Sequence, residues 1–478
     1  MRWPRTACVP LGDEPVAPPA RTGEAQGTPD HRSRVVRSAW ARHLFADLAA
    51  FTLTILSVAP IHAQEDPRRV QIRGFLRAEG EYNDNFFLTE KNKRDDFREI
   101  LTPGLSLRLS TGRSQAEISY APSLIHSSVN DQDVQVFHLL DANGSLALAE
   151  RFTLKAGDHF LRSDEPAITD PRGIRRDRTI LIQNTLSSDL TYKQDTWSLT
   201  PRYALTLNRT ERENKTGGVS GGNPTAGRNQ ERSLVHALGA DGTLDILDRN
   251  TLGAGYELTV GEFEVANDFV GHLGRFSFSR QLNPLTTASL GGSVAHRDVR
   301  GGSDFNIFRG DAGLRRDVSP LYAVEARVGY GVFDVSGGKS IGEVEYSLTG
   351  TYTGRVVRIS VTSGQSFQET FLEQNNVGVT RTREHKLEVR YEPTDRVALS
   401  LRARVADNRF LQPTTFTTLG QQQERKDLLI DIGPELGFRL TRLLSLTMGY
   451  TYTRVDSNLR GFDYENNRVR LGLTATFE

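Results

Sequence analysis

Cysteine is almost absent from this sequence, and several kinds of chemistry are absent with it. The 478 residues include one cysteine, Cys8, and two methionines. Cys8 lies upstream of a predicted cleavage site, so we expect the mature chain to contain no thiol. Disulfides, cysteine metal sites and cysteine nucleophiles are therefore excluded from the mature protein.

Long apolar runs are scarce as well. Hydrophobic residues make up 37% of the chain, whereas globular chains usually carry about 45–50%. Beyond residue 60 no run approaches the roughly 20 apolar residues of a transmembrane helix. Disorder is also excluded, because balanced charge, 23 Phe and 13 Tyr do not fit a highly charged segment that is poor in aromatics. A membrane β-barrel remains, since it needs only a thin apolar coat on the outside of the sheet.

The first sixty residues differ in composition from the rest. Residues 1–34 are rich in proline, glycine and arginine, without periodicity, and are predicted to be a disordered or wrongly assigned leader. Residues 35–63 contain Arg37 and Arg42, an apolar run over 44–58, and a small-residue site ending at Ala63. This pattern predicts a secretory signal peptide. Translation from near Val35 and a genuine long leader are both open, and the barrel is predicted to occupy residues 64–478.

The mature chain has little net charge. The leader holds seven basic and five acidic residues, which leaves 52 basic against 54 acidic residues. A nucleic-acid partner is therefore not predicted, because such proteins carry a basic patch or stripe.

The dominant pattern from Val70 to Phe477 is alternation with period two. In residues 197–208, for example, Trp197, Leu199 and Tyr203 share one parity, while Arg202 has the other. Successive side chains of a strand point to opposite faces, so each such segment has one apolar and one polar face. We count about twenty segments of this kind, each able to hold the roughly 9–11 residues that cross a bilayer at a tilt.

The connections between these segments alternate between short and long. Residues 111–114, 193–195 and 441–442 are short links, whereas 83–96, 163–177, 210–230 and 411–425 are long and polar. Outer-membrane barrels have short periplasmic turns and long outer loops. The sequence therefore predicts an all-β fold, a transmembrane antiparallel up-and-down β-barrel of about 18–20 strands. A β-sandwich would need several domains with linkers, and a β-helix would need a short repeat; neither is visible.

Four prolines conflict with this pattern. Pro103, Pro122, Pro201 and Pro434 fall in mid-strand, although proline belongs at sheet edges or bulges. We therefore expect bulges, or strands displaced by a few residues, at these positions.

The end of the chain resembles a known signal. Residues 470–477 run from the polar Arg470 through Gly472 to alternate apolar residues that end at Phe477. This is similar to the C-terminal signal read by the outer-membrane assembly machinery. The resemblance implies that machinery as a partner and the cell outer membrane as the location.

Two segments near the predicted mature start carry a second resemblance. The sequence EGEYNDNFFL at residues 79–88 follows the first predicted strand, and LTPGLSL at 101–107 opens the second. They resemble the β-barrel porin family of the outer membrane, which includes barrels associated with exopolysaccharide export and with PEP-CTERM/exosortase systems. The resemblance implies an outer-membrane barrel, and with it a link to exopolysaccharide.

If the apolar parity faces lipid, the alternate parity faces the lumen and is rich in charge. The predicted lumen-facing residues are Arg73, Arg77, Glu79, Arg108, Glu117, Arg202, Glu325, Arg327, Glu343, Glu345, Arg402, Arg404, Glu435, Arg439, Arg468 and Arg470. They indicate a hydrophilic conduit whose charges contact solute. The alternative is that opposite charges pair across strands and stiffen the wall. Residues 210–230, with five glycines, are a candidate constriction.

Three classes of function follow, of which a porin-like conduit, serving exopolysaccharide export, is favoured. The alternative is a structural barrel that anchors a surface matrix. An enzyme is not predicted, because His126 and His159 adjoin loops with Asp and Ser but no nucleophile–base pair can be assigned. No cofactor or metal is predicted either, since the Asn/Asp runs at 83–85 and 130–133 lack the EF-hand spacing. The expected partners are outer-membrane lipid, the assembly machinery and a polysaccharide.

Overall fold

The computed structural model describes residues 69–477 apart from 131–133, 166–178, 212–229, 265, 373–374, 412–413 and 416–421. The predicted leader (1–34) and signal peptide (35–63) lie outside the described residues, as does most of the candidate constriction at 210–230. Within the described part of the chain, no helix has the length and apolarity needed to cross a membrane.

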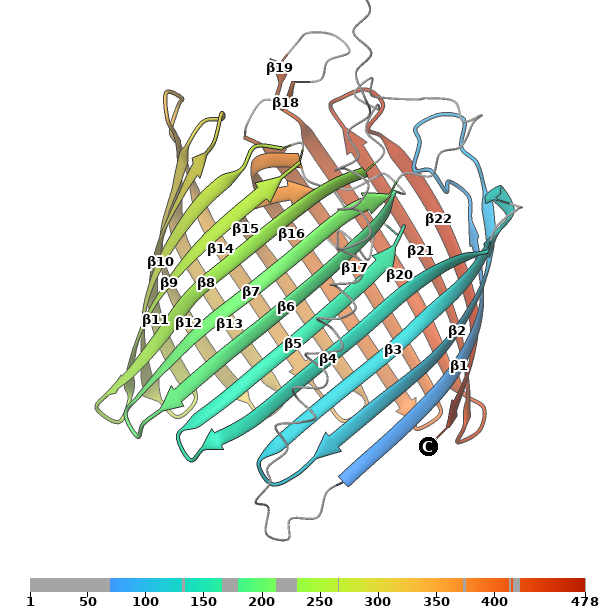
Figure 1. The fold of residues 1–478 in the computed structure, drawn as a ribbon, viewed down its shortest axis with the longest axis horizontal. Coiled ribbons are helices and arrows are strands. Elements are labelled where there is room, and N and C mark those ends of the chain that lie inside the picture. Colours follow the sequence, from blue (N-terminus) through green and yellow to red (C-terminus); the bar gives the residue numbers. More distant parts are fainter. Residues whose placement is uncertain are drawn as a thin grey trace, which may run out of the picture. The chain divides into compact units, whose positions relative to one another are not determined.

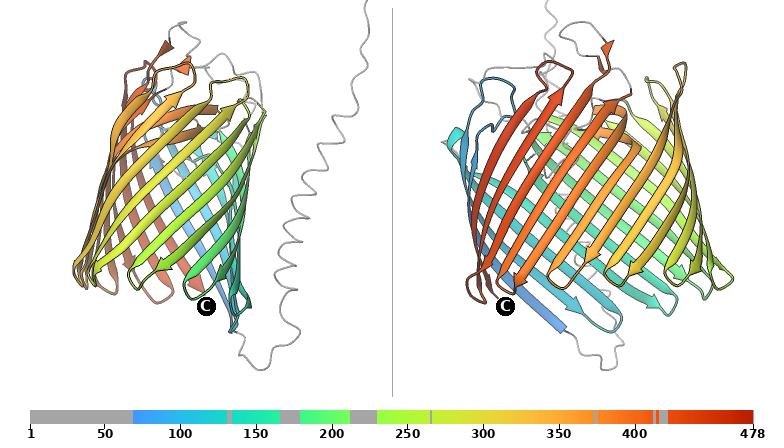
Figure 2. Two further views of the ribbon diagram at one scale, coloured as in Figure 1. Left: turned by 90° about the vertical axis from the view of Figure 1, so that its left-hand side faces the viewer. Right: turned by 180° about the vertical axis from the view of Figure 1, so that it is seen from behind.

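Twenty antiparallel strands form one closed sheet, because β1 pairs with both β2 and β22. The predicted fold class is therefore confirmed, and Figures 1 and 2 show the barrel from three sides. The elements are β1 (Arg69–Asn83), β2 (Asp96–Ser110), β3 (Ser114–Ser127), η1 (Ser128–Asn130), β4 (Gln135–Ala149), β5 (Phe152–Ser163), β6 (Ile180–Lys193), β7 (Trp197–Glu211), β8 (Gln230–Ile246), β9 (Asn250–Phe263), β10 (Phe269–Asn283), β11 (Thr286–Val299), β12 (Phe305–Ser319), β13 (Tyr322–Val335), β14 (Ile341–Thr353), β15 (Val357–Leu372), β16 (Asn375–Thr394), β17 (Val397–Phe410), β18 (Thr414–Thr415), β19 (Gln422–Gln423), β20 (Lys426–Arg439), β21 (Leu444–Ser457) and β22 (Tyr464–Phe477). The short β18 and β19 pair only with each other.

The alternation in the sequence separates the two faces of this wall. On β12, for example, Phe308 and Leu314 are 44% and 47% exposed, while Arg309, of the opposite parity, bonds to Glu345 on β14. Side-chain contacts between strands two or more apart converge on the concave side of a closed sheet. We therefore call the polar parity the inner face and the apolar parity the outer face.

The two ends of the barrel differ in their connections. At the end we call the turn end, consecutive strands are joined by two to four residues, such as 111–113 and 440–443. At the opposite, loop end the connections are mostly longer, such as 84–95 and 411–425. The connection between β15 and β16 is an exception, because only residues 373–374 separate these strands, which have 16 and 20 residues.

The four mid-strand prolines do not produce bulges, so that expectation is wrong. The β2–β3 ladder stops at Leu101↔Leu124 and resumes at Leu105↔Tyr120 in the same register, which places Pro103 opposite Pro122. Similar interruptions without a register shift lie beside Pro201 in β6–β7 and beside Pro434 in β20–β21. Proline removes one donor, and the wall tolerates the loss by opening the ladder on one side while pairing on the other continues.

Candidate functional site

The inner face carries all sixteen predicted lumen-facing residues, as their strand parity requires. Eleven of them form ion pairs within 4.0 Å: Glu79, Arg108, Glu117, Arg202, Glu325, Arg327, Glu343, Glu345, Arg404, Arg468 and Arg470. Arg77 instead lies over the ring of Phe75. Most of these pairs join different strands, although Glu325 and Arg327 pair within β13. Contact of the sixteen side chains with water or solute stays a prediction.

A ladder of alternating charge crosses the inner face from β7 to β10. The guanidinium of Arg202 contacts Asp241 and Glu257, each at 2.8 Å, and Arg275 contacts Asp241 at 3.1 Å. These side chains are about one-third exposed, so solvent screens the pairs and each contributes little to stability. The ladder nevertheless fixes where the charges lie along the wall.

Glycines on the inner face leave room for these charged side chains. A Cβ built at Gly255 would lie 2.2 Å from Oδ1 of Asp241, and one at Gly239 would lie 3.0 Å from Nε of Arg202. Since neither strand position offers a side chain, the neighbouring charged group lies flat across it. The charges therefore lie along the wall.

The hairpin of β15 and β16 leaves the wall at the loop end. The β14–β15 ladder ends at Tyr346↔Gln365, and beyond this pair β15 continues with β16 as its only partner. Phe367 N then donates to Oε1 of Glu345 on β14 at 2.8 Å. We call residues 365–369 and 379–382 the inner strap.

The strap crosses the inner side of several strands. Arg309 of β12 donates to the carbonyl of Phe367, and Nε of Arg297 on β11 lies 2.7 Å from Oε2 of Glu369. On the return strand, Arg381 contacts Glu343 of β14 at 2.8 Å. Because these partners lie on β11, β12 and β14, the strap is held against the inner wall over a span of four strands.

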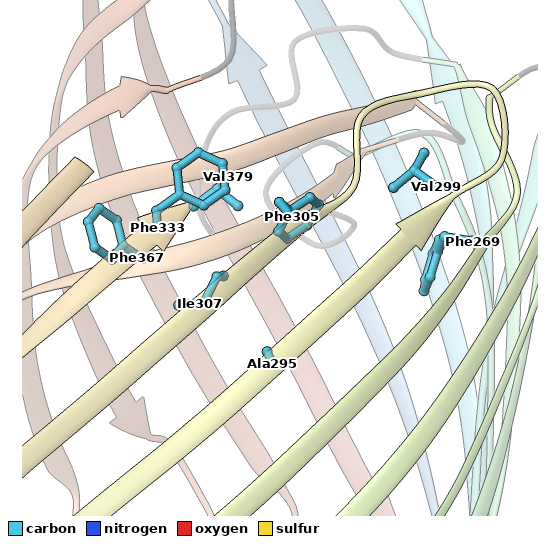
Figure 3. Close-up of a cluster of buried hydrophobic side chains, with 8 residues drawn as sticks. All are labelled: Phe269, Ala295, Val299, Phe305, Ile307, Phe333, Phe367 and Val379. Atoms are coloured by element: carbon cyan, nitrogen blue, oxygen red, sulfur yellow. The ribbon is translucent and has the colours of Figure 1, made fainter. Parts of the chain in front are cut away.

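An apolar cluster lies beneath the strap. Phe367 and Val379 are 2% and 0% exposed and pack with Phe305 and Phe333, each 1% exposed. The Phe333 and Phe367 rings are 6.4 Å apart, and Figure 3 shows these side chains gathered between the strap and the wall. Apolar groups on the polar parity are thus explained by a covering segment of the same chain.

The sequence contained a signal for this cluster that we did not use. Phe305, Ile307 and Phe333 have the charged parity of β12 and β13 and therefore break the alternation near the loop end. Gly331 lies beneath the strap, where an added Cβ would be 3.0 Å from Cδ2 of Phe367. Large apolar side chains at inner positions, together with a neighbouring glycine, indicate that something packs there.

A second segment crosses the inner wall at the loop end. Residues 164–165 follow β5, yet Asp164 lies 2.6 Å from Arg98 of β2, and Glu165 lies 2.9 Å from Arg468 of β22. The side chains of Arg98 and Asp164 are 4% and 7% exposed. A buried ion pair is costly to break, because one charge is left without its partner.

The turn-end half of the inner face is more open. A polar groove of about 630 Å³ runs from β2 to β6 and is lined by Arg108, Glu117, Asn143, Lys155 and Asp189 among others. The groove is lined by two cationic and two anionic side chains, so their formal charges cancel. The lumen is therefore covered by chain segments near the loop end and presents open polar surface near the turn end.

The candidate catalytic histidines are not brought together. Nδ1 of His159 lies 2.6 Å from Oδ1 of Asp141 on the inner face, while His126 has the outer-face parity of β3. Among the described residues, no group of three or more His, Cys, Asp or Glu side chains could hold a metal ion. Within residues 83–85, Asn85 bonds to Thr89 and Glu465, which ties the loop after β1 to β22.

Comparisons with known proteins agree with this architecture. Residues 306–477, from β12 to β22, match the family model described as Putative beta-barrel porin 2. This match supports the porin resemblance predicted from the sequence. No curated protein matches the chain.

Solved structures of outer-membrane barrels are similar in fold. The ferric enterobactin receptor of Pseudomonas aeruginosa, a mutant in complex with enterobactin, is 12% identical with a TM-score of 0.50, over 85% of this chain and 81% of that chain. The outer membrane protein opdK of the same organism is 13% identical with a TM-score of 0.42, over 85% and 99%. OccAB3 of Acinetobacter baumannii is 11% identical with a TM-score of 0.40, over 85% and 99%.

The family match and the closed barrel together assign the protein to the outer membrane as a porin-like barrel. The matched family model is described as a porin model, and the similar solved structures are of an outer membrane protein and a ferric enterobactin receptor. In such barrels the long loops are extracellular and the short turns periplasmic, so we expect the strap at the extracellular end.

Proposed function

We propose that this barrel is a conduit for hydrophilic solutes and that the inner strap narrows its extracellular end. The observation that carries the proposal is the inner face itself, which in the described strands is lined mainly by charged and polar side chains, apart from the apolar cluster beneath the strap. Buried charges are costly unless they are hydrated or paired. An inner face of this kind is stable when it lines water.

The strand number supports a water-filled lumen. Barrels of about 16–18 strands leave an aqueous channel, and this wall has twenty strands. Opposite charges balance in the ladder from β7 to β10 and in the groove from β2 to β6. We therefore expect a large conductance with weak preference between anions and cations.

We further propose that the cargo is a hydrophilic polymer, of which an exopolysaccharide is the leading candidate. Two features support a polymer. The charges lie flat along the wall, so the lumen is wide and offers few protruding groups that would trap a chain. The open polar groove lies on the periplasmic side, while the strap lies at the extracellular exit. The resemblance near the mature start favours polysaccharide within this class.

The decisive experiment is conductance of the purified protein in a planar lipid bilayer. We expect stepwise current, and a larger step when residues 366–381 are replaced by a short turn. A matched control replaces the loop 458–463, which joins β21 and β22. If neither the intact protein nor the variant without the strap conducts, the conduit is excluded.

An anchoring role is the second candidate, and one observation favours it. Two segments, the strap and residues 164–165, are held across the inner wall by contacts of low exposure. A barrel closed permanently by them would carry no current and would serve as a membrane anchor for a surface matrix. The same bilayer measurement separates the two functions.

A further inference from the structure

Two rows of inner-face side chains form the polar groove near the turn end. In strands β2 to β6 the register places these residues opposite one another from strand to strand. The first row consists of Arg108, Glu117, Asn143, Gly157 and Ser187. The second row, one step nearer to the turn end, consists of Ser110, Gln115, Ser145, Lys155 and Asp189. All of these residues line the groove, and Figure 1 shows strands β2 to β6 side by side.

Many of these side chains have no partner within the protein. In the described part of the chain, no hydrogen bond or ion pair is made by the side chains of Gln115, Asn143, Ser145, Lys155 and Asp189. Gln115, Asn143 and Lys155 are also exposed. The wall from β7 to β10 differs, because its charged side chains pair with one another. The groove therefore presents free polar groups to a molecule that enters the lumen.

Gly157 lies between two polar side chains of the first row and leaves a gap there. A Cβ built at Gly157 would lie 3.0 Å from Oδ1 of Asn143 and 3.1 Å from Oγ of Ser187. The hydroxyl of Ser187 donates to the carbonyl of Gly157 at 3.4 Å, which is long for a hydrogen bond between oxygens. The amide on β4 and the hydroxyl on β6 thus border the same gap, and a ligand hydroxyl placed in it reaches both.

The donors and acceptors of the groove suit a ligand with many hydroxyl groups. Amide and hydroxyl side chains both donate and accept hydrogen bonds, and so does each hydroxyl of a sugar. The groove contains the amides of Gln115 and Asn143 and the hydroxyls of Ser110, Ser145 and Ser187. These groups match a polyhydroxylated molecule in both directions of hydrogen bonding.

The charged side chains of the groove do not favour an ionic ligand. Arg108 is already bonded to Oε2 of Glu117, through Nε at 3.1 Å and Nη2 at 2.6 Å. Lys155 lies opposite Asp189 on the next strand, so an ion attracted by one side chain is repelled by the other. The formal charges of the groove cancel, and an uncharged ligand fits this balance best.

The dimensions of the groove fit a chain of several sugar units. Its volume of about 630 Å³ lies within the range of about 300–1,000 Å³ that is usual for small-molecule sites. Neighbouring strands lie about 4.7–4.9 Å apart, which is close to the length of one pyranose unit. A linear saccharide that follows the rows therefore places successive units beside successive strands.

We propose that the polar groove binds an uncharged saccharide chain near the turn end of the lumen. This inference rests on the proposed conduit, to which it adds the charge class of the polymer and the surface that holds it. Asn143 and Ser187 bind the hydroxyls of one sugar unit across Gly157, and Gln115 and Ser145 bind those of the unit beside it. Each of these hydrogen bonds replaces one to water and contributes little net affinity, so the chain is held weakly enough to move on.

The test is binding of linear hexasaccharides to the purified, folded barrel, with the dissociation constant measured by saturation-transfer NMR. The probes are an uncharged glucan and a chain of uronic acids, and we expect the glucan to bind more tightly. The Gln115→Ala/Asn143→Ala double variant should bind the glucan about tenfold more weakly, because two hydrogen bonds are lost. The matched control is Ser279→Ala/Gln281→Ala, which removes a hydroxyl and an amide from the inner face of β10 outside the groove. This control should bind the glucan like the native protein.

A further variant keeps every polar group of the groove. Gly157→Ala fills the gap between Asn143 and Ser187, so we expect weaker binding of the glucan here too. Heat-modifiable migration in gels confirms that each barrel is folded. If the folded double variant binds the glucan like the native protein, or if the native barrel binds the uronic acid chain equally well, the inference is overturned.

Conductance of the same protein in a planar bilayer separates this inference from the conduit. A barrel that conducts ions but does not bind the glucan refutes the saccharide site and leaves the conduit standing. A barrel that binds the glucan with the expected loss in the double variant, yet carries no current, supports the site and refutes the conduit.

Discussion

Phe367→Ala should release the inner strap from the wall. The side chain of Phe367 is 2% exposed and packs against Phe333 within the apolar cluster. Truncating a buried phenylalanine costs about 3–5 kcal/mol in a protein core. Taking the lower value, the balance between the bound and the released strap shifts by roughly two orders of magnitude, because about 1.4 kcal/mol corresponds to a factor of ten.

Single-channel recording measures this shift as the fraction of time spent at the larger of two conductance levels. We expect the larger level to gain occupancy in Phe367→Ala. Phe308→Ala provides the matched control, since Phe308 is 44% exposed on the outer face of β12. If the folded Phe367→Ala barrel and the control occupy the larger conductance level equally, the apolar cluster does not hold the strap against the wall. Our account of how the strap narrows the lumen would then be wrong.

Three further predictions test the wall. Gly255→Ala should displace the carboxylate of Asp241, because the added Cβ would lie 2.2 Å from Oδ1. Since this moves a charge on the inner face, the reversal potential of the channel in a salt gradient should shift measurably. A cysteine at position 402, in place of Arg402, should react with a membrane-impermeant thiol reagent, whereas one in place of Tyr450 should not; the opposite pattern would exchange the two faces. Arg98→Met should lower the free energy of unfolding by about 3–5 kcal/mol, since its buried carboxylate partners lose their counter-charge; a denaturant titration that finds no loss would contradict this.

The barrel could be predicted from the sequence because its pattern is local. In β20 and β21 alternate residues are apolar, which predicts strands with one apolar face. Each of the twenty barrel strands pairs with the next barrel strand along the chain, so pattern and order together give the topology. The charged side chains were assigned to one face for the same reason, since parity needs only the neighbours in sequence.

The strap could not be predicted in this way, because it depends on contacts that are distant in sequence. Nothing near Glu369 indicates that it meets Arg297, which lies 72 residues earlier. The alternation at Val357, Ile359 and Val361 predicts an ordinary strand and does not indicate that β15 leaves the wall. The prediction of bulges at the four prolines was wrong for a different reason. We treated a missing donor as a cause of bulging, whereas the wall opens the ladder between Pro103 and Pro122 and keeps its register.

The glycines that leave room for charged side chains have a consequence for how this sequence can evolve. Where a glycine makes room for a charge on the next strand, as Gly255 does for Asp241, neither position can change freely alone. A side chain at 255 would collide with the carboxylate, whereas loss of the carboxylate would remove the need for glycine. In an alignment of related barrels we expect the two positions to covary, with glycine retained wherever a charged residue is present opposite it. Such coupled columns would locate the inner face of relatives for which no structure is known.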